Sequence, residues 1–265
     1  MNKITHISKD LAICTNTNPK YKPKFNATNE NINWAAFSWN PVTGCLKACP
    51  WCYARKRAEN DYFKSGFPTG FKPTFHPARL LAPSNTSIPK DKVDLPGIRR
   101  VFVCSMADLF GDWVPAEWIQ SVIDTCADNT QWDFLLLTKN PKRYQEFTFP
   151  LNCWLGATAD TQTRADRAIA VFKNITGNIK FLSSEPLMAP ITFTSNSLTA
   201  VDLLILGALK GSECTVRQPD RAWVAHLVNQ AVTANCLYLY KPNLTALPAA
   251  YPDSPDVYPA SLISR

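Results

Sequence analysis

The sequence predicts an α/β protein, organised as a partial (β/α)6-type, TIM-like barrel with parallel strands, and three observations indicate this class. First, 265 residues with 46% hydrophobic content are enough for one sizeable core. Second, from Val101 onward, short apolar runs end in small or polar residues and are followed by stretches of helical pattern. Third, nearly continuous apolar strands separated by crossover helices are typical of a parallel sheet with a covered outer face.

The elements follow in order along the chain. Residues 1–33 are polar and lack periodicity, which predicts an extended N-terminal arm before a single domain over residues 34–265. Helices are expected over residues 115–128, 159–175 and 219–235. The six apolar runs that predict strands are 101–108, 134–140, 153–160, 179–186, 203–209 and 237–242.

The stretch from Ser65 to Arg100 is rich in proline and has little periodicity. It predicts a long loop with a short helix around His76 to Leu81. Such a loop either covers a substrate or serves as a passive connection, and both readings stay open.

Charge and hydropathy limit the class of partner. The net charge of +7 favours anionic partners and permits nucleic acid without demonstrating it. No apolar run approaches the roughly 18 residues of a membrane span, and the first residues lack the apolar core of a signal peptide. We therefore expect a cytoplasmic protein with no membrane association, in which the clustered cysteines, three of the nine, serve metal binding or catalysis more readily than disulfides.

Cys45, Cys49 and Cys52 lie within eight residues, in the sequence GCLKACPWCYARKR. Clustered thiolates suit zinc or an iron-sulfur cluster, but a structural zinc site normally takes four ligands, and no second CxxC follows. Three ligands leave one metal position open for a substrate. The alternatives are three free thiols, or zinc completed by the distant Cys104 or His76.

Polar side chains close the predicted strands. In parallel barrels chemistry gathers at the carboxyl ends of the strands, although Ser, Thr and Asp are also favoured there simply as helix caps. Lys139 and Glu185 are the strongest candidates, because burying a charge is costly without a partner. The polar residues at these ends are Ser105, Asp108, Thr138, Lys139, Thr158, Asp160, Ser184, Glu185 and Lys241.

The CxxxCxxC spacing after a first strand, with Trp51 just before the last cysteine, resembles the signature of the radical SAM superfamily. Over roughly residues 34–242 the chain also resembles a phage-associated, three-cysteine-motif radical-SAM-like family of uncharacterised proteins, and more distantly spore photoproduct lyase. The segments that carry this resemblance are WNPVTGC (39–45), CYA (52–54), HPARL (76–80), RRVFVCSMADLF (99–110), LLLTKNPKR (135–143), WLGATAD (154–160), FLSSEPL (181–187) and LYLYKP (237–242).

The resemblance implies a 4Fe-4S cluster held by the three cysteines, in the loop after the first strand. Its open iron would bind S-adenosyl-L-methionine, which is cleaved reductively to a 5′-deoxyadenosyl radical with electrons from an external donor such as flavodoxin or ferredoxin. Trp51 and Tyr53 would lie beside the cluster and bind the cofactor, with an aromatic face or adjacent backbone available to the adenine; ordinary core packing is the alternative. Lys139 and Glu185 would act in catalysis, and Cys104 either donates a hydrogen atom or simply packs as a small buried side chain. The residues expected to bind S-adenosylmethionine are Ser105, Asp108, Thr138, Thr158, Asp160, Ser184 and Glu185.

Three functions follow as hypotheses. The first is a radical SAM enzyme acting on a nucleic acid or nucleotide-derived substrate, by modification or as a repair lyase. The second directs the same chemistry at a peptide or small metabolite, with residues 65–100 as a lid. The third is a non-catalytic, metal-stabilised binding protein, because GALKG (207–211) replaces the Gly-Gly-Glu-Ser-Gly of relatives and KPNL (241–244) their Lys-Gln-Trp-Gly.

Overall fold

The computed structural model describes residues 2–28, 32–194, 196–209 and 217–247. The chain divides into two compact units. The first comprises Met1–Thr28 and Ala35–Thr138, and the second comprises Asn29–Trp34 and Lys139–Arg265. The boundary after Thr138 falls inside the region that the sequence treats as one domain.

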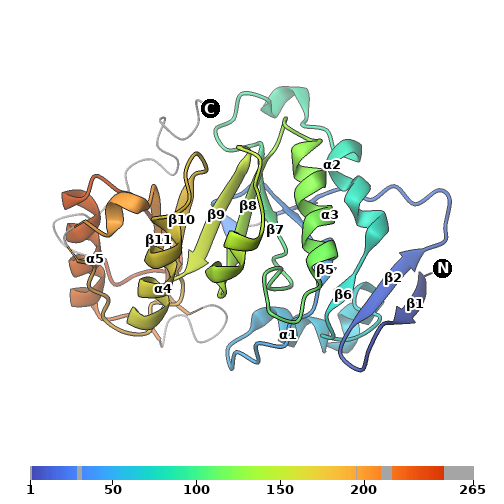
Figure 1. The fold of residues 1–265 in the computed structure, drawn as a ribbon, viewed down its shortest axis with the longest axis horizontal. Helices are drawn as coiled ribbons and strands as arrows, with labels where there is room; N and C mark the ends of the chain where they lie inside the picture. Colours follow the sequence, from blue (N-terminus) through green and yellow to red (C-terminus); the bar gives the residue numbers. More distant parts are fainter. Residues whose placement is uncertain (1, 29–31, 195, 210–216, 248–265) are drawn as a thin grey trace. The chain divides into compact units, whose positions relative to one another are not determined.

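Four strands of the first unit lie in the order β3-β4-β7-β8. They are β3 (Asn26–Ala27), β4 (Phe37–Trp39), β7 (Arg100–Val103) and β8 (Asp133–Thr138). The pairs β4–β7 and β7–β8 are parallel, and β3 pairs antiparallel with β4. The crossover from β7 to β8 is helix α3 (Ala116–Ala127), which is labelled in Figure 1. The helix buries Trp118, Ile119 and Val122.

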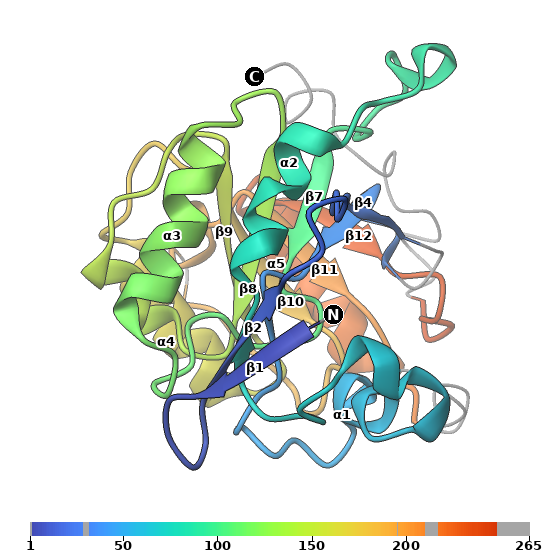
Figure 2. The same cartoon turned by 90° about the vertical axis from the view of Figure 1, so that its right-hand side faces the viewer.

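The same unit contains a second sheet, in the order β1-β2-β6-β5. Its strands are β1 (Asn2–His6), β2 (Ala12–Asn16), β6 (Thr74–Phe75) and β5 (Val42–Thr43). Figure 2 shows β1 and β2 side by side near the N-terminus. Residues 1–33 therefore hold a hairpin, which differs from the extended arm that the sequence predicts. The reason is non-local: β1 is almost wholly exposed, and β2 is held by pairing with β6, some sixty residues later.

Short helices fill the rest of the first unit. They are α1 (Tyr53–Ala58), η2 (Asp61–Gly66), η3 (Pro77–Leu81), α2 (Ala82–Asn85) and η4 (Lys90–Lys92). The short helix expected around His76 to Leu81 is confirmed as η3, which begins at a proline that is favourable in a first helical turn.

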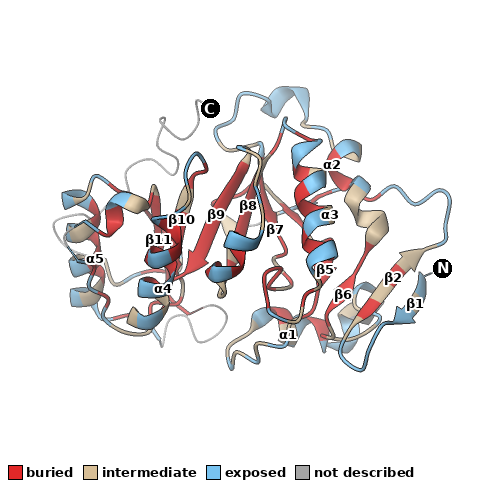
Figure 3. Cartoon of the chain, viewed as in Figure 1, coloured by how far each residue is buried: buried red, intermediate tan, exposed pale blue. Residues whose placement is uncertain are grey.

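The second unit contains four parallel strands in the order β9-β10-β11-β12. They are β9 (Cys153–Thr158), β10 (Lys180–Ser184), β11 (Leu203–Leu206) and β12 (Leu237–Tyr240), and β9 and β11 are buried throughout (Figure 3). Helix α4 (Gln162–Phe172) connects β9 to β10, and α5 (Arg221–Thr233) precedes β12. The described part of the unit also contains the 3-10 turns η5 (Pro141–Glu146) and η6 (Leu198–Ala200).

The α/β class with parallel strands is confirmed, because each of the six predicted apolar runs overlaps one of the strands β7 to β12. The three predicted helices are confirmed as α3, α4 and α5. Among the described residues, the strands of each unit form an open row and no barrel closes within either unit. Within this part of the chain, no helix is both long and apolar enough to cross a membrane.

Candidate metal centre

The three-cysteine segment begins at a glycine that no other residue can replace without strain. Gly44 has φ +84°, and a Cβ built on it would lie 2.3 Å from the carbonyl oxygen of Lys72. The N–H of Gly44 donates to the Met106 carbonyl oxygen at 2.9 Å, and the N–H of Cys45 donates to the Phe71 carbonyl oxygen at 3.2 Å. The first cysteine is thus held between two segments that are distant in the sequence.

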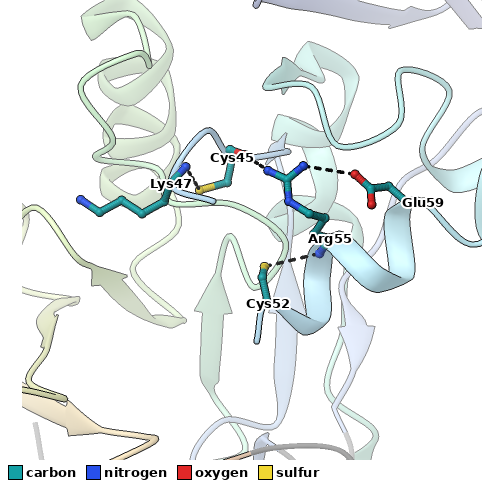
Figure 4. Close-up of polar contacts among 5 residues, drawn as sticks. All are labelled: Cys45, Lys47, Cys52, Arg55 and Glu59. Carbon is teal, nitrogen blue, oxygen red and sulfur yellow. Dashed lines mark hydrogen bonds and ion pairs between the residues drawn. The ribbon is translucent and has the colours of Figure 1, made fainter. Parts of the chain in front are cut away.

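Backbone N–H groups donate to two of the three sulfur atoms, as Figure 4 shows. The N–H of Lys47 lies 3.4 Å from Cys45 Sγ, and the N–H of Arg55 lies 3.4 Å from Cys52 Sγ. Cys52 is the N-cap of α1, and its own N–H donates to the Cys49 carbonyl oxygen at 3.1 Å. Hydrogen bonds to sulfur favour the thiolate, which is the form that binds a metal.

The three thiols are half-buried. Cys45 and Cys52, together with Phe67, pack against a buried cluster of apolar side chains: Ala54, Ala58, Phe71 and Met106. Burial, together with the charges of Asp108, Cys52 and Cys49, raises the pKa of the Cys45 thiol to about 11, although the hydrogen bond from the Lys47 N–H lowers it in part. Negative charge therefore accumulates here if the thiols ionise, and a bound cation would offset it.

The donor set fits a thiolate-bound iron-sulfur cluster in its chemistry, because it offers three soft ligands, two of which pack against apolar side chains. Among the described residues, however, no three His, Cys, Asp or Glu side chains are grouped as a metal site. To hold a common metal centre, the three sulfur atoms would have to turn toward one another. Zinc completed by His76 gains no support, because His76 Nε2 is engaged with Thr43 Oγ1 at 2.8 Å.

Two predicted residues, Tyr53 and Ser105, contact each other. Tyr53 Oη donates to the Ser105 carbonyl oxygen at 2.5 Å, which links α1 to the turn after β7. The Ser105 hydroxyl lies 3.2 Å from Asn40 Nδ2, and Asn40 Oδ1 accepts the Met106 N–H at 2.9 Å. Asn40 is a residue that sequence reasoning missed, and its position in WNPVTGC, just before the cysteines, was the available signal.

The remaining candidates of the first unit divide into a pair and two single residues. Thr138 Oγ1 donates to Asp108 Oδ1 at 2.6 Å, and both residues are buried. Trp51 is half-buried in the turn before α1. Cys104 is buried at φ +58°, and burial raises its pKa to about 12, so the thiol is protonated as a hydrogen-atom donor must be; that role stays a prediction.

The candidates of the second unit bind partners within the protein. Lys139 Nζ lies 3.5 Å from Thr158 Oγ1. The Ser184 hydroxyl donates to the Ala159 carbonyl oxygen at 2.7 Å. Asp160, which is 1% exposed, forms an ion pair with Arg164, one turn later in the chain. These contacts explain why Ser184 and Asp160 stay buried, and a role in cosubstrate binding stays a prediction for them.

Glu185 and Lys241 form a buried ion pair, with Glu185 Oε2 and Lys241 Nζ 3.2 Å apart. They follow β10 and β12, which flank β11 on opposite sides. The side chains meet because Gly207 stands between them, and a Cβ there would lie 2.9 Å from Glu185 Cγ and 3.0 Å from Lys241 Cγ. The charge on Glu185 is thus compensated by the lysine that sequence analysis placed at another strand end.

Comparison with known proteins gives one match. A family described as "Protein of unknown function (DUF5131)" matches residues 29–245, which is most of the chain. No curated protein and no solved structure matches the chain. The matched range includes the three cysteines and every candidate residue named above. The chain belongs to the DUF5131 family of proteins of unknown function.

Proposed function

We propose that the protein is a radical SAM enzyme with a 4Fe-4S cluster bound by Cys45, Cys49 and Cys52. The observation that carries the proposal is the surrounding of these three thiols: they lie within eight residues, are half-buried, and two of the sulfur atoms accept backbone N–H groups. When bound, the reduced cluster would supply the electron that cleaves S-adenosylmethionine to methionine and a 5′-deoxyadenosyl radical. An external donor of the flavodoxin or ferredoxin type restores that electron.

The chain's own residues have defined tasks in this proposal. The apolar side chains against Cys45 and Cys52 exclude water from the thiolates, and the N–H groups of Lys47 and Arg55 stabilise their charge. The hydrogen bond from Tyr53 to Ser105 fixes α1 against the turn after β7, which carries the candidate residues Cys104 and Ser105. The residues assigned to S-adenosylmethionine binding remain Ser105, Asp108, Thr138, Thr158, Asp160, Ser184 and Glu185.

The proposal also includes the barrel architecture and the location of the protein in the cell. The parallel strands β7 to β12 support a partial (β/α)6-type barrel. A cytoplasmic location supports the chemistry, because thiol ligands stay reduced there and the electron donors are available.

For the substrate we propose a nucleic acid or a nucleotide-derived molecule, on the distribution of charge. Residues 1–79 contain twelve Lys and Arg against four Asp and Glu, while the rest of the chain has sixteen against seventeen. The excess of positive charge therefore lies in the part of the chain that holds the cysteines, and a phosphate backbone is attracted to such a region. The basic residues are Lys3, Lys9, Lys20, Lys22, Lys24, Lys47, Arg55, Lys56, Arg57, Lys64, Lys72 and Arg79; the acidic ones are Asp10, Glu30, Glu59 and Asp61.

The test is anaerobic reconstitution with iron and sulfide, reduction with dithionite, addition of S-adenosylmethionine and assay of 5′-deoxyadenosine. A triple alanine variant of Cys45, Cys49 and Cys52 should bind no cluster and form no product. The matched control is Cys236→Ala, which removes a buried thiol of the second unit and should behave as wild type. A wild-type protein that takes up no cluster would sink the proposal, and a cluster-loaded wild-type protein that forms no 5′-deoxyadenosine would favour a non-catalytic, metal-stabilised binding protein.

The substrate class has its own test. Binding of single-stranded and double-stranded DNA and RNA is followed by fluorescence anisotropy at 50 and 200 mM salt. Phosphate contacts predict a steep loss of affinity, on the order of tenfold or more for several contacts. If no nucleic acid binds at low salt, and 5′-deoxyadenosine is still produced, the peptide or metabolite alternative gains support.

A further inference from the structure

Arg55 contacts both ends of the three-cysteine segment, as the close-up shows (Figure 4). Its backbone N–H donates to Cys52 Sγ at 3.4 Å, and its Nη2 donates to the Cys45 carbonyl oxygen at 3.2 Å. Cys45 and Cys52 are the first and last of the proposed ligands. A single residue thus spans the segment from one end to the other.

The guanidinium group of Arg55 is itself held on two further sides. Nη1 donates to Glu59 Oε1 at 3.1 Å, one turn along α1, and Cζ lies 4.8 Å from the centroid of the Phe71 ring. Phe71 also accepts the Cys45 N–H through its carbonyl oxygen. With a side chain about one-third exposed, the ion pair with Glu59 alone contributes little, but the combined contacts define where the guanidinium lies.

We propose that Arg55 is a positioning residue for the cluster: it fixes Cys45 relative to Cys52 and places a positive charge against the Cys45 backbone, at one end of the ligand segment. The inference rests on the proposed function. A 4Fe-4S cluster gains one negative charge when it is reduced, so a neighbouring cation stabilises the reduced state. Arg55 therefore has two measurable effects: it slows the loss of the cluster, and it raises the reduction potential.

Four variants separate these effects. Arg55→Gln removes the charge and the forked set of donors. Arg55→Lys keeps the charge, but a single ammonium cannot contact the Cys45 carbonyl, Glu59 and the Phe71 ring together. Glu59→Gln removes one anchor of the guanidinium and leaves its contact with Cys45. Lys56→Gln is the matched control, because it removes one positive charge from the exposed neighbour on the same helix.

The experiment uses the reconstituted full-length protein. The rate of cluster loss to an iron chelator is followed by absorbance, the potential by redox titration, and the reduced cluster by its electron paramagnetic resonance spectrum. Arg55→Gln should lose its cluster about 10- to 100-fold faster than wild type, as is typical when a residue that orients a metal ligand is removed, and should have a lower potential. In Arg55→Lys, the reduction potential should be closer to the wild-type value than the rate of cluster loss is, because the charge is kept but the forked contacts are not. Lys56→Gln should match wild type in both the potential and the rate of cluster loss.

The outcomes distinguish this proposal from the proposed function. If wild type takes up no cluster, both fall. If wild type holds a cluster and Arg55→Gln matches Lys56→Gln in retention and potential, only the role of Arg55 is overturned. If the Arg55→Gln apoprotein does not fold, Glu59→Gln decides, because a freed guanidinium predicts faster cluster loss than in wild type, and an unchanged rate overturns the proposal.

Discussion

Three glycines of the first unit allow the local strain at the cysteine segment to be measured by alanine substitution. Gly66 has ordinary backbone angles and open space around it, and Gly70 has φ +61° with no atom within 4 Å of a built Cβ. Gly44 combines φ +84° with contacts of 2.3 Å to the Lys72 oxygen and 2.6 Å to the Phe71 oxygen. The series therefore adds one cost at a time.

The magnitudes follow from this geometry. Gly66→Ala should leave the free energy of unfolding within about 0.5 kcal/mol of wild type. Gly70→Ala should cost about 1 kcal/mol, because a left-handed backbone costs alanine about 1–2 kcal/mol and the loss of unfolded-state freedom offsets part of it. Gly44→Ala should cost about 3 kcal/mol, because relieving the overlap also weakens two backbone hydrogen bonds, each contributing about 1 kcal/mol.

Thermal unfolding and thiol labelling test the series. For a chain of this size, about 3 kcal/mol corresponds to a fall in Tm of about 6–12 °C, and about 1 kcal/mol to 2–4 °C. Cys45 should also react faster with a thiol reagent in Gly44→Ala, because the segment leaves its place beside Phe71. If Gly44→Ala and Gly70→Ala melt at the same temperature, the contact with residues 71 and 72 does not hold the segment and the reasoning is refuted.

Three further predictions concern buried ionisable side chains. Lys241→Met leaves the Glu185 carboxylate buried and should cost about 3–5 kcal/mol in denaturant unfolding, most of which Glu185→Gln should restore. Arg164→Ala similarly leaves Asp160 uncompensated, at a cost of about 1–3 kcal/mol. For His76, the folded pKa of about 3 lies below the unfolded value of 6.5, so stability is fully present above pH 6.5 and falls toward pH 3 by up to about 1.4 kcal/mol per pH unit; His76→Gln should flatten that slope.

Each of these predictions has a result that contradicts it. For Lys241, the double variant must be more stable than the single one; equal unfolding midpoints would mean that the pair is solvated. For Arg164, an unchanged midpoint would show that Asp160 does not depend on this partner. For His76, an identical pH profile with and without the imidazole would place the acid sensitivity in other groups.

The strands and the cysteines were predictable because their signals are local. Each of the strands β7 to β12 is a run of apolar residues long enough to be recognised alone, and the three cysteines are recognised by spacing. The N-terminal hairpin was not predictable in this way. Strand β1 has no apolar face, and what orders it is pairing with β2 and, through β2, with Thr74 and Phe75.

The partners at the candidate sites depend on register, which the sequence does not reveal. Ser184 and Tyr240 both align with Leu206, so the residues that follow them stand on either side of Gly207. The two charges were each identified as candidates, but their pairing needs this alignment and the missing Cβ. Arg55 gave only its spacing from Glu59 as a signal, whereas its contact with the Cys45 carbonyl is tertiary.

The pairing of β5 with β6 affects how the protein would respond to exposure to oxygen. Val42 and Thr43 pair with Phe75 and Thr74, so this strand pairing joins the two ends of the loop formed by residues 44–73. The entropy lost when the loop closes is therefore offset by contacts within the protein, without a contribution from a metal. A cluster held by residues 45–52 would cross-link only a short part of it. The fold should therefore survive oxidative loss of the cluster, and a damaged molecule could be repaired by reinserting iron and sulfide, without being unfolded or degraded.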